Sequence, residues 1–398
     1  MTYAGGRGYL AIPGPSVMPD RVLQAMHRPA PNIYEGDLVD MVYGIVPDLK
    51  YVARTEHYVA IYTGNGHAAW EAALSNVVAE GDKVLVPATG RFGHGWADMA
   101  VGLGVVPEVI DFGRAGPFDP NRIEAALRAD KTHEIKAVLA THVDTSSSVL
   151  NPVAEVRAAL DAAGHPALLM ADCIASMGCD RFEMDAWGVD VAITASQKGL
   201  MVPPGLGFVF FNEKAKAQRA GMARVSRYWD WTPRAEPEMF YQFSGGTAPT
   251  HHLFGLREAL DMIREEGIEA IWARHERHAR AVWAAADAWA EAGVLTMNIK
   301  DMEHRSRAVT AMRVGLPYGP QLREWVEQHA GLVLGIGLGM SEPGDEGGKG
   351  FFRLGHMGHV NAHMIMGLLG GIEAAFQALQ MPHGGGALEA AAAKLAEI

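Results

Sequence analysis

The strongest constraint on the fold is the alternation of short apolar runs with longer helical stretches between residues 58 and 211. Runs such as Tyr58–Tyr62, Lys83–Pro87 and Ala137–Thr141 have the length and composition of buried strands. Stretches with helical spacing, such as residues 121–129, separate these runs. This alternation predicts a mostly parallel sheet sandwiched between helices, because each parallel connection has to cross a face of the sheet.

One lysine lies between two predicted strands, in a segment where a charged side chain is unexpected. Lys198 follows the apolar run Val189–Ile193 and precedes Gly207–Phe211, with the turn Pro203-Pro204-Gly205 in between. Burying an ammonium group is costly unless it is paired or its pKa falls. A lysine with a lowered pKa is a nucleophile that forms Schiff bases with aldehydes, whereas an ordinary turn lysine keeps its ammonium in water. The segment alone leaves both interpretations open.

A carboxylate ends another of the predicted strands. Asp172 closes the apolar run Ala167–Asp172, and open α/β sheets bind their ligands beyond the carboxyl ends of their strands. A lysine that holds pyridoxal phosphate as an imine, with an aspartate at the pyridinium nitrogen, is the usual arrangement in enzymes that use this cofactor. Asp172 and Lys198 together therefore form a candidate cofactor site.

The order and spacing of these segments resemble the class V aminotransferases of fold type I, specifically the alanine/serine/aspartate–glyoxylate branch. The resemblance runs from Pro13-Gly14-Pro15 to Arg353-Leu354-Gly355 and rests on Asp172, on Ser196-Gln197-Lys198 and on Pro203-Pro204-Gly205. It implies the α/β PLP-transferase fold, in which a large domain with a mostly parallel sheet between helices is joined to a small C-terminal α+β domain.

The length of 398 residues also favours more than one domain. The resemblance and the composition shifts along the chain predict an N-terminal arm at 1–20, a large PLP-binding domain at 21–255, a bridging helix at 256–292, a small C-terminal domain at 293–383 and a C-terminal helical tail at 384–398. Residues 212–250 are expected to be irregular.

The resemblance assigns roles to three residues of the reaction itself. It implies that Lys198 holds pyridoxal phosphate and moves the proton, and that Asp172 keeps the ring nitrogen protonated. Arg353 would bind the α-carboxylate of the amino acid, because a guanidinium offers two parallel hydrogen bonds to a carboxylate. The alternative for Arg353 is a strand-end arginine in a surface ion pair.

Further cofactor contacts are expected near the ends of other predicted strands. The sequence Thr63-Gly64-Asn65-Gly66-His67 lies between a strand and a helix, where free backbone N–H groups and the helix dipole favour a phosphate. An ordinary tight turn or a helix cap explains such segments equally well when they stand alone. The resemblance implies these cofactor-binding residues: Gly66, His67 and Gln197 at the phosphate, Phe92 stacked on the ring, Thr145 at the phenolic oxygen, and Thr247 at the phosphate of a neighbouring subunit.

Two places depart from the family pattern. Ser244 stands where a tyrosine is expected to reach the neighbouring phosphate, and whether Tyr241 replaces it is left open. The segment Asn32–Asp37, in a region that shapes the substrate pocket in the family, also differs, which leaves the donor open among serine, alanine and aspartate. The implied acceptor is glyoxylate, with glycine and a 2-oxo acid as products, and the implied assembly is a homodimer or a higher homo-oligomer.

Composition excludes some other classes of function. A net charge of −12 argues against nonspecific binding to nucleic acid or to anionic membranes. The N-terminal segment lacks the apolar core of a signal peptide, and no apolar run reaches membrane-spanning length. With only two cysteines, Cys173 and Cys179, no disulfide framework is expected, so the sequence favours a cytoplasmic enzyme.

The sequence gives weaker support to functions other than that of a glyoxylate aminotransferase. His356, His359 and His363 have helical spacing, but no cysteine or carboxylate nearby completes a ligand set, so no metal is expected. A desulfurase needs a cysteine on a mobile loop, and the candidate loop at 339–348 has none. A class V lyase, a pyruvate-dependent aminotransferase and a noncatalytic or nucleotide-binding α/β protein, in which Lys198 is an ordinary turn residue, stay open.

Overall fold

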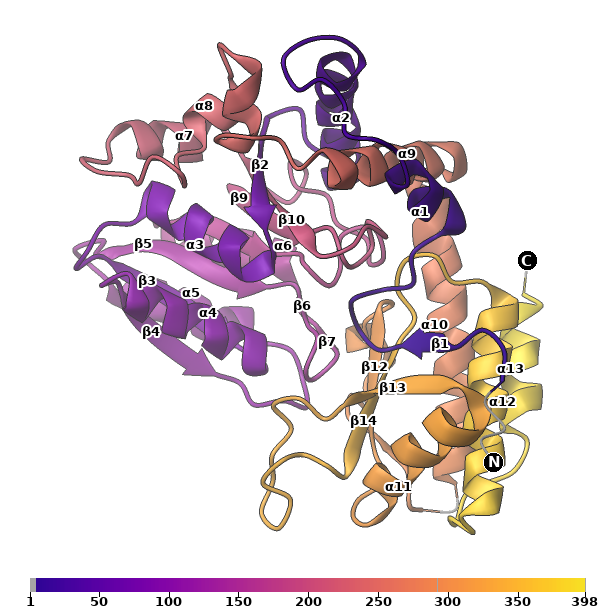
Figure 1. The fold of residues 1–398 in the computed structure, drawn as a ribbon. Helices are drawn as coiled ribbons and strands as arrows, with labels where there is room; N and C mark the ends of the chain where they lie inside the picture. The colour runs from indigo at the N-terminus through magenta and orange to yellow at the C-terminus, as the bar shows by residue number, and fades with distance from the viewer. Residues whose placement is uncertain (1–4, 292, 398) are drawn as a thin grey trace.

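A computed structural model describes residues 5–291 and 293–397 of the chain. The start of the expected arm at residues 1–4, residue 292 at the end of the expected bridging helix, and residue 398 of the expected tail lie outside the described residues. Figure 1 shows two sheets, a large one in the first part of the chain and a smaller one next to the C-terminal helices.

The large sheet has seven strands in the order β2-β10-β9-β8-β5-β3-β4. The five strands from β9 to β4 pair in parallel, and β10 is antiparallel to both β9 and β2. The mostly parallel sheet predicted from the sequence is therefore confirmed. The strands are β2 (Tyr58–Gly64), β3 (Lys83–Ala88), β4 (Val106–Asp111), β5 (Ile135–Thr141), β8 (Leu168–Asp172), β9 (Val191–Ala195) and β10 (Gly205–Phe211).

Helices cover both faces of this sheet, because successive residues of a strand point to opposite sides. In β2, Val59 and Ile61 pack in one apolar core with residues of α2, α5, α6 and α9, whereas Ala60 and Tyr62 pack in a second core with α3 and α4. These helices are α2 (Asp37–Ala53), α3 (Gly66–Val77), α4 (Arg91–Gly102), α5 (Pro120–Ala129), α6 (Val153–Ala163) and α9 (Thr250–Glu266).

The smaller sheet has five strands in the order β1-β13-β14-β12-β11. β1 lies in the N-terminal arm and pairs in parallel with β13, so the arm is anchored on the C-terminal sheet. Its strands are β1 (Tyr9–Ala11), β11 (Thr296–Met297), β12 (Val309–Arg313), β13 (Leu332–Ile336) and β14 (Phe351–Gly355), and its helices are α10 (Ile268–Ala290), α11 (Tyr318–Trp325), α12 (Ala362–Ala378) and α13 (Ala387–Leu395). Helix α13 buries Ala387 and Ala391 in the apolar core that α10 and α12 share.

Two expectations about regular structure were wrong. The helical stretch expected from residue 256 to 292 is interrupted at Gly267, whose φ of 86° is unfavourable for other residues, so that α9 and α10 are separate helices. Residues 212–250 are not wholly irregular. They contain α7 (Glu213–Ala220), α8 (Thr232–Ala235) and the 3₁₀ turn Phe240–Ser244.

The remaining elements are short or terminal. They are α1 (Asp20–Met26), β6 (Val143–Asp144), β7 (Val149–Leu150), the 3₁₀ turn Met302–His304 and the π-helical turn Val326–Ala330. Within the described residues, every helix is too short or too polar to cross a membrane. The domain boundaries given above stay a prediction.

Candidate active site

Lys198 lies in the turn after β9, and its side chain is buried rather than solvated, with only 9% of the residue exposed. The ammonium Nζ donates a hydrogen bond to the carbonyl oxygen of Pro13 in the N-terminal arm. Burial and the nearby positive charge of Arg353 lower the pKa of this ammonium to about 8, while the Asp172 carboxylate acts in the opposite direction. An amine with this pKa is partly neutral near pH 7 and is therefore a competent nucleophile.

The N-terminal arm closes over the lysine. Ser16 donates its backbone N–H to the Gln197 carbonyl at 2.9 Å and its hydroxyl to the Lys198 carbonyl at 2.7 Å. Gly14 has a φ of 97°, and a Cβ at this position would overlap Lys198 Nζ. A residue with no side chain is therefore required where the arm crosses the amine.

Asp172 ends β8 and is 3% exposed. Burial, with a contribution from the nearby Asp144 carboxylate, raises the pKa of Asp172 to about 7, although a hydrogen bond of 2.8 Å from the Ile174 N–H favours the ionised form. A buried carboxyl with a raised pKa is stabilised in its charged form by a cationic partner. A protonated ring nitrogen would supply such a partner.

Arg353 projects from β14 and is 6% exposed. Its Nε donates to the Ile336 carbonyl and its Nη1 to the Thr145 carbonyl, each at 2.7 Å. No carboxylate of the described residues forms an ion pair with it, and burial lowers the pKa of this guanidinium to about 10. A surface ion pair for Arg353 is therefore wrong, and the buried charge is well suited to bind a carboxylate.

Asp144, which the sequence did not single out, acts electrostatically on both Asp172 and Arg353 and supports the loops beside them. Its Oδ2 accepts the backbone N–H groups of Phe92 at 2.8 Å and Gly93 at 3.2 Å, which caps the start of α4. Its Oδ1 accepts the backbone N–H of Ser146 at 2.9 Å, which fixes the loop that carries Thr145. The only signal in the sequence was an acid placed inside a Ser/Thr cluster before a helix.

The expected phosphate seat has one feature that the sequence did not reveal. Asn65 caps α3, and its Oδ1 accepts the backbone N–H of His67 at 3.0 Å and of Ala68 at 3.3 Å. The His67 N–H is therefore already hydrogen-bonded, whereas the sequence predicted that it would be a free donor. Gly66 allows close packing, because a Cβ there would overlap the end of the Ile174 side chain next to Asp172 and force it to move.

Phe92 lies beside this seat. It and His67 line a cavity of about 380 Å³ and both contact the Trp70 ring, with centroid distances of 6.3 Å for Phe92 and 4.8 Å for His67. Gln197, next to Lys198, has a buried side-chain Oε1 with no hydrogen-bond partner among the described residues. An amide left unsatisfied in this way has a hydrogen-bonding group available for a ligand.

Thr247 is separate from this cluster within one chain. It is exposed in the segment before α9, and no hydrogen bond or ion pair described for the chain joins it to the other candidate residues. Ser244, at the position where a tyrosine was expected, is buried, while Tyr241 is exposed. The structure therefore gathers Lys198, Asp172, Arg353, Thr145 and Phe92, and leaves Thr247 outside.

Comparisons with known proteins identify the family. A family model described as aminotransferase class-V matches residues 48–331. The serine–glyoxylate aminotransferase of Methylorubrum extorquens is 38% identical over 379 residues, covering 92% of this chain and 90% of the relative. The L-aspartate–glyoxylate aminotransferase of Paracoccus denitrificans is 37% identical over 381 residues, covering 93% and 91%.

The chain belongs to the class V aminotransferase family. Solved structures agree with this membership. The ureidoglycine–glyoxylate aminotransferase from Bacillus subtilis has a TM-score of 0.87 at 25% identity and covers 98% of each chain. The pyridoxamine–pyruvate aminotransferase from Mesorhizobium loti has a TM-score of 0.87 at 25% identity and covers 99% of each chain. The aminotransferase therefore has the PLP-transferase fold type I, as the sequence resemblance implied.

The residues of this class V aminotransferase fit the cofactor that the family implies. Lys198 offers a buried amine of lowered pKa, and Asp172 offers a buried carboxyl that lacks a fixed cation. These two properties match the aldehyde and the ring nitrogen of pyridoxal phosphate, respectively. The unsatisfied Gln197 Oε1 beside them is an acceptor, so this atom would meet a donor group of a ligand rather than a phosphate oxygen.

Proposed function

We propose that this aminotransferase uses pyridoxal phosphate to transfer the amino group of serine, alanine or aspartate to glyoxylate, giving glycine and a 2-oxo acid. The observation that carries the proposal is the buried guanidinium of Arg353, which forms no ion pair with a carboxylate of the described residues and lies near the low-pKa amine of Lys198. The named activities of relatives at 37–38% identity, which act on serine or aspartate with glyoxylate, support this choice of substrates.

Pyridoxal phosphate, when bound, supplies an aldehyde carbon that bonds to an amine and a ring that takes up the electron pair of the Cα–H bond. Lys198 Nζ is the amine that holds it between turnovers, and the same amine then moves the proton to and from the substrate Cα. Its pKa of about 8 suits both tasks near neutral pH. Pro13 orients this amine through its carbonyl oxygen.

Arg353 orients the substrate. Its Nε and Nη1 are fixed by two backbone carbonyls, which leaves Nη2 to meet the α-carboxylate without further ordering of the side chain. Asp172 stabilises a protonated ring nitrogen, because burial makes its own negative charge costly without a cation. Phe92 provides a ring face for the cofactor plane, and Asp144 holds it there through the start of α4.

We assign the oxygen atoms of the cofactor to the remaining candidates. Thr145 is placed for the phenolic oxygen, because its carbonyl is bonded to Arg353 and its loop is held by Asp144. Gly66, His67 and Gln197 are assigned to the phosphate, which sits at the positive end of α3. At this end the phosphate competes with Asn65 for the His67 N–H.

We further propose a homodimer in which Thr247 of one subunit reaches the phosphate of the other. Thr247 is exposed, as are the large side chains of Tyr241 in the same segment and of Tyr34 before α2, which are 52% and 84% accessible. Tyr43 joins the two regions through an edge contact of 5.1 Å with Phe243. The free, buried thiols of both cysteines support a reducing compartment, and we place the enzyme in the cytoplasm.

The test is a titration of the visible absorption band of the purified protein. We expect serine, alanine or aspartate, added without any keto acid, to bleach the band, and glyoxylate to restore it. Restoration by pyruvate but not by glyoxylate would assign a pyruvate-dependent enzyme instead. A donor that is consumed with release of ammonia, without bleaching, would indicate a lyase.

A further inference from the structure

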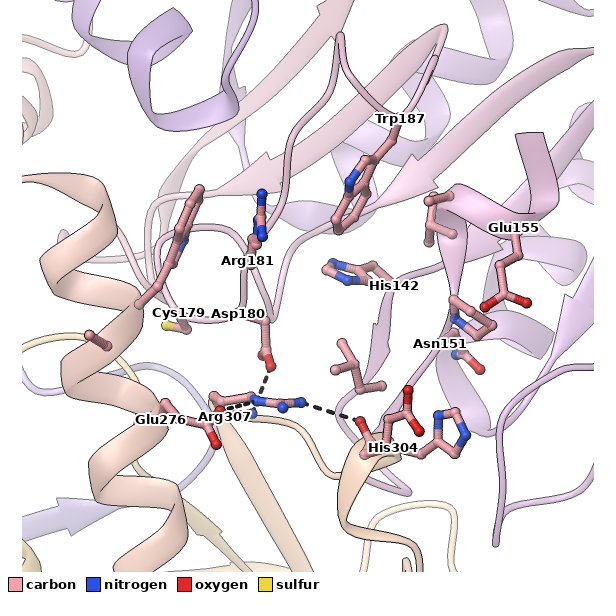
Figure 2. A pocket seen from close by; sticks show the side chains of 17 residues that line it. His142, Asn151, Glu155, Cys179, Asp180, Arg181, Trp187, Glu276, His304 and Arg307 are labelled. Carbon is pink, nitrogen blue, oxygen red and sulfur yellow. Dashed lines mark hydrogen bonds and ion pairs between the residues drawn. The ribbon is translucent and has the colours of Figure 1, made fainter. Parts of the chain in front are cut away.

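A second cavity, of about 510 Å³, lies behind the segment 172–180. One end of this segment, Asp172, interacts with Lys198, whereas the other end, Asp180, lines the cavity. Figure 2 shows its lining, which comes from the residue after β5, the start of α6, the loop before β9, helix α10 and the segment 303–307. The volume is in the range of cavities that bind small molecules. The proposed function uses none of these residues.

At the base of the cavity lies a histidine with one unused ring nitrogen. His142 is 2% exposed, and its Nδ1 shares a hydrogen bond of 2.9 Å with Ser176 Oγ. Its Nε2 has no hydrogen-bond partner among the described residues, and the ring lines the cavity. Burial, with a contribution from the positive charge of Arg307, lowers the pKa of His142 to about 3, so the imidazole is neutral. In the tautomer whose Nδ1–H is donated to Ser176 Oγ, Nε2 is an acceptor. An acceptor without a protein partner suits a ligand that donates an N–H or O–H.

The walls of the cavity are mainly aromatic and aliphatic. Trp187 packs edge to face on His142, with ring centroids 5.4 Å apart and an angle of 82°. Trp272 of α10 also lines the cavity, together with aliphatic side chains such as Leu150 and Val153. Indole faces attract both flat rings and cations. The lining therefore favours a small aromatic ligand over a polyhydroxylated one.

The charged residues of the lining determine whether a cationic or an anionic ligand is favoured. Both cations are paired: Arg307 Nε with Glu276 at 2.6 Å, and Arg181 with Glu183 at 2.5 Å. Glu155 and Glu303 are exposed at the rim of the cavity and form no ion pair with the described residues.

The fourth acid of the lining is also accounted for. Asp180 already accepts hydrogen bonds from Ser306 Oγ at 2.9 Å and from the Arg307 N–H at 2.7 Å. The uncompensated charge around the cavity is therefore negative, and it is carried by the two rim glutamates. A cation is favoured there over an anion.

We propose that this cavity binds a small aromatic ammonium ion. The aromatic ring packs against Trp187 and Trp272, the ammonium N–H is donated to Nε2 of His142, and Glu155 and Glu303 stabilise the positive charge. The site is separate from Lys198 and does not depend on the proposed transamination. The combination of two indoles with carboxylates is a known means of binding alkylated ammonium groups.

The probe is the N,N-dimethylbenzylammonium ion, measured by isothermal titration calorimetry on the cofactor-loaded enzyme. As a tertiary amine it forms no Schiff base with the cofactor, and it keeps one N–H for His142. Benzyltrimethylammonium keeps the charge without the N–H, and benzyl alcohol keeps the ring without the charge. We expect one saturable site per chain, with the dimethyl ion binding at least ~5-fold more tightly than benzyl alcohol and more tightly than the trimethyl ion.

Variants test whether the ion binds in this cavity. Trp272→Leu, on α10, should weaken binding of the dimethyl ion by about 5- to 30-fold. The double change Glu155→Gln with Glu303→Gln should weaken binding of the dimethyl ion by roughly 3- to 10-fold and leave the affinity for benzyl alcohol unchanged. Glu389→Gln, an exposed glutamate of α13, is the matched control and should have no effect. Absence of saturable binding, or affinity unaffected by both the tryptophan and the glutamate changes, would overturn the proposal.

Discussion

Replacing Arg353 by glutamine tests whether the buried guanidinium serves the substrate rather than the fold. Burial lowers its pKa from 12.5 to about 10, which corresponds to roughly 3 kcal/mol of unfavourable free energy in the charged form. Because the folded pKa lies below the unfolded one, this cost is present at every pH below about 10. A bound substrate carboxylate offsets this cost. Removal of the guanidinium in Arg353→Gln should therefore lower kcat/KM for amino acids by about 10²- to 10³-fold.

The assay compares the half-reaction of alanine with that of ethylamine, which lacks the carboxylate. The wild-type enzyme should prefer alanine strongly, whereas Arg353→Gln should lose most of this preference while its rate with ethylamine changes little. The midpoint of thermal unfolding should move by only a few degrees, because the lost hydrogen bonds are offset by removal of the buried charge.

A matched control is available on α11. Arg323 also donates to two backbone carbonyls beside β14, those of Lys349 at 3.0 Å and Phe351 at 2.7 Å. Arg323→Gln should leave the preference for alanine intact. If Arg353→Gln kept the wild-type preference, or if Arg323→Gln lost it equally, the assignment of the carboxylate site would be refuted.

Three further variants test the surrounding site. Burial raises the pKa of Asp172 to about 7, so the cofactor-free wild type should lose more stability than Asp172→Asn as pH rises from about 4 to 7; both proteins keep the contribution of Asp180, whose pKa burial raises to about 6, and parallel urea-unfolding profiles would contradict this. Asp144→Ala should lower the free energy of unfolding by about 3–5 kcal/mol, because several buried donors lose their acceptor, against about 1 kcal/mol for the exposed helix cap Asp119→Ala. Gly14→Ala should displace the lysine amine and, through this misplacement, reduce turnover at least ~10-fold. Gly5→Ala, a position with open space around it, should leave turnover unchanged. Equal turnover of the two glycine variants would exclude a role for the arm.

Local pattern predicted the large sheet well. The strands at 58–64, 83–88 and 168–172 are short apolar runs that end in polar or small residues, and this signal lies within each run. The placement of Asp172 and Lys198 at neighbouring strand ends followed from the same reasoning. Pairing between distant segments carries no such local signal, so the parallel contact of β1 with β13 was not foreseen.

Other features were missed because one sequence pattern serves two purposes. Asn65 before Gly66 reads equally as a helix cap and as part of an anion seat, and the structure shows the cap engaged. Gly267 reads as a tolerated glycine within a helical stretch, yet its positive φ divides α9 from α10. Asp144 looks like one more residue of a polar loop, because its hydrogen bonds to α4 arise only in the folded chain.

The central claim is that Lys198 is the amine that holds the cofactor. Reduction of the purified protein with borohydride, followed by peptide mapping by mass spectrometry, tests it most directly. We predict a pyridoxyl phosphate group on the peptide that contains Lys198, and none on that peptide after prior incubation with an amino donor that bleaches the visible band. A label on another lysine, or no label on a protein supplied with pyridoxal phosphate, would contradict the account.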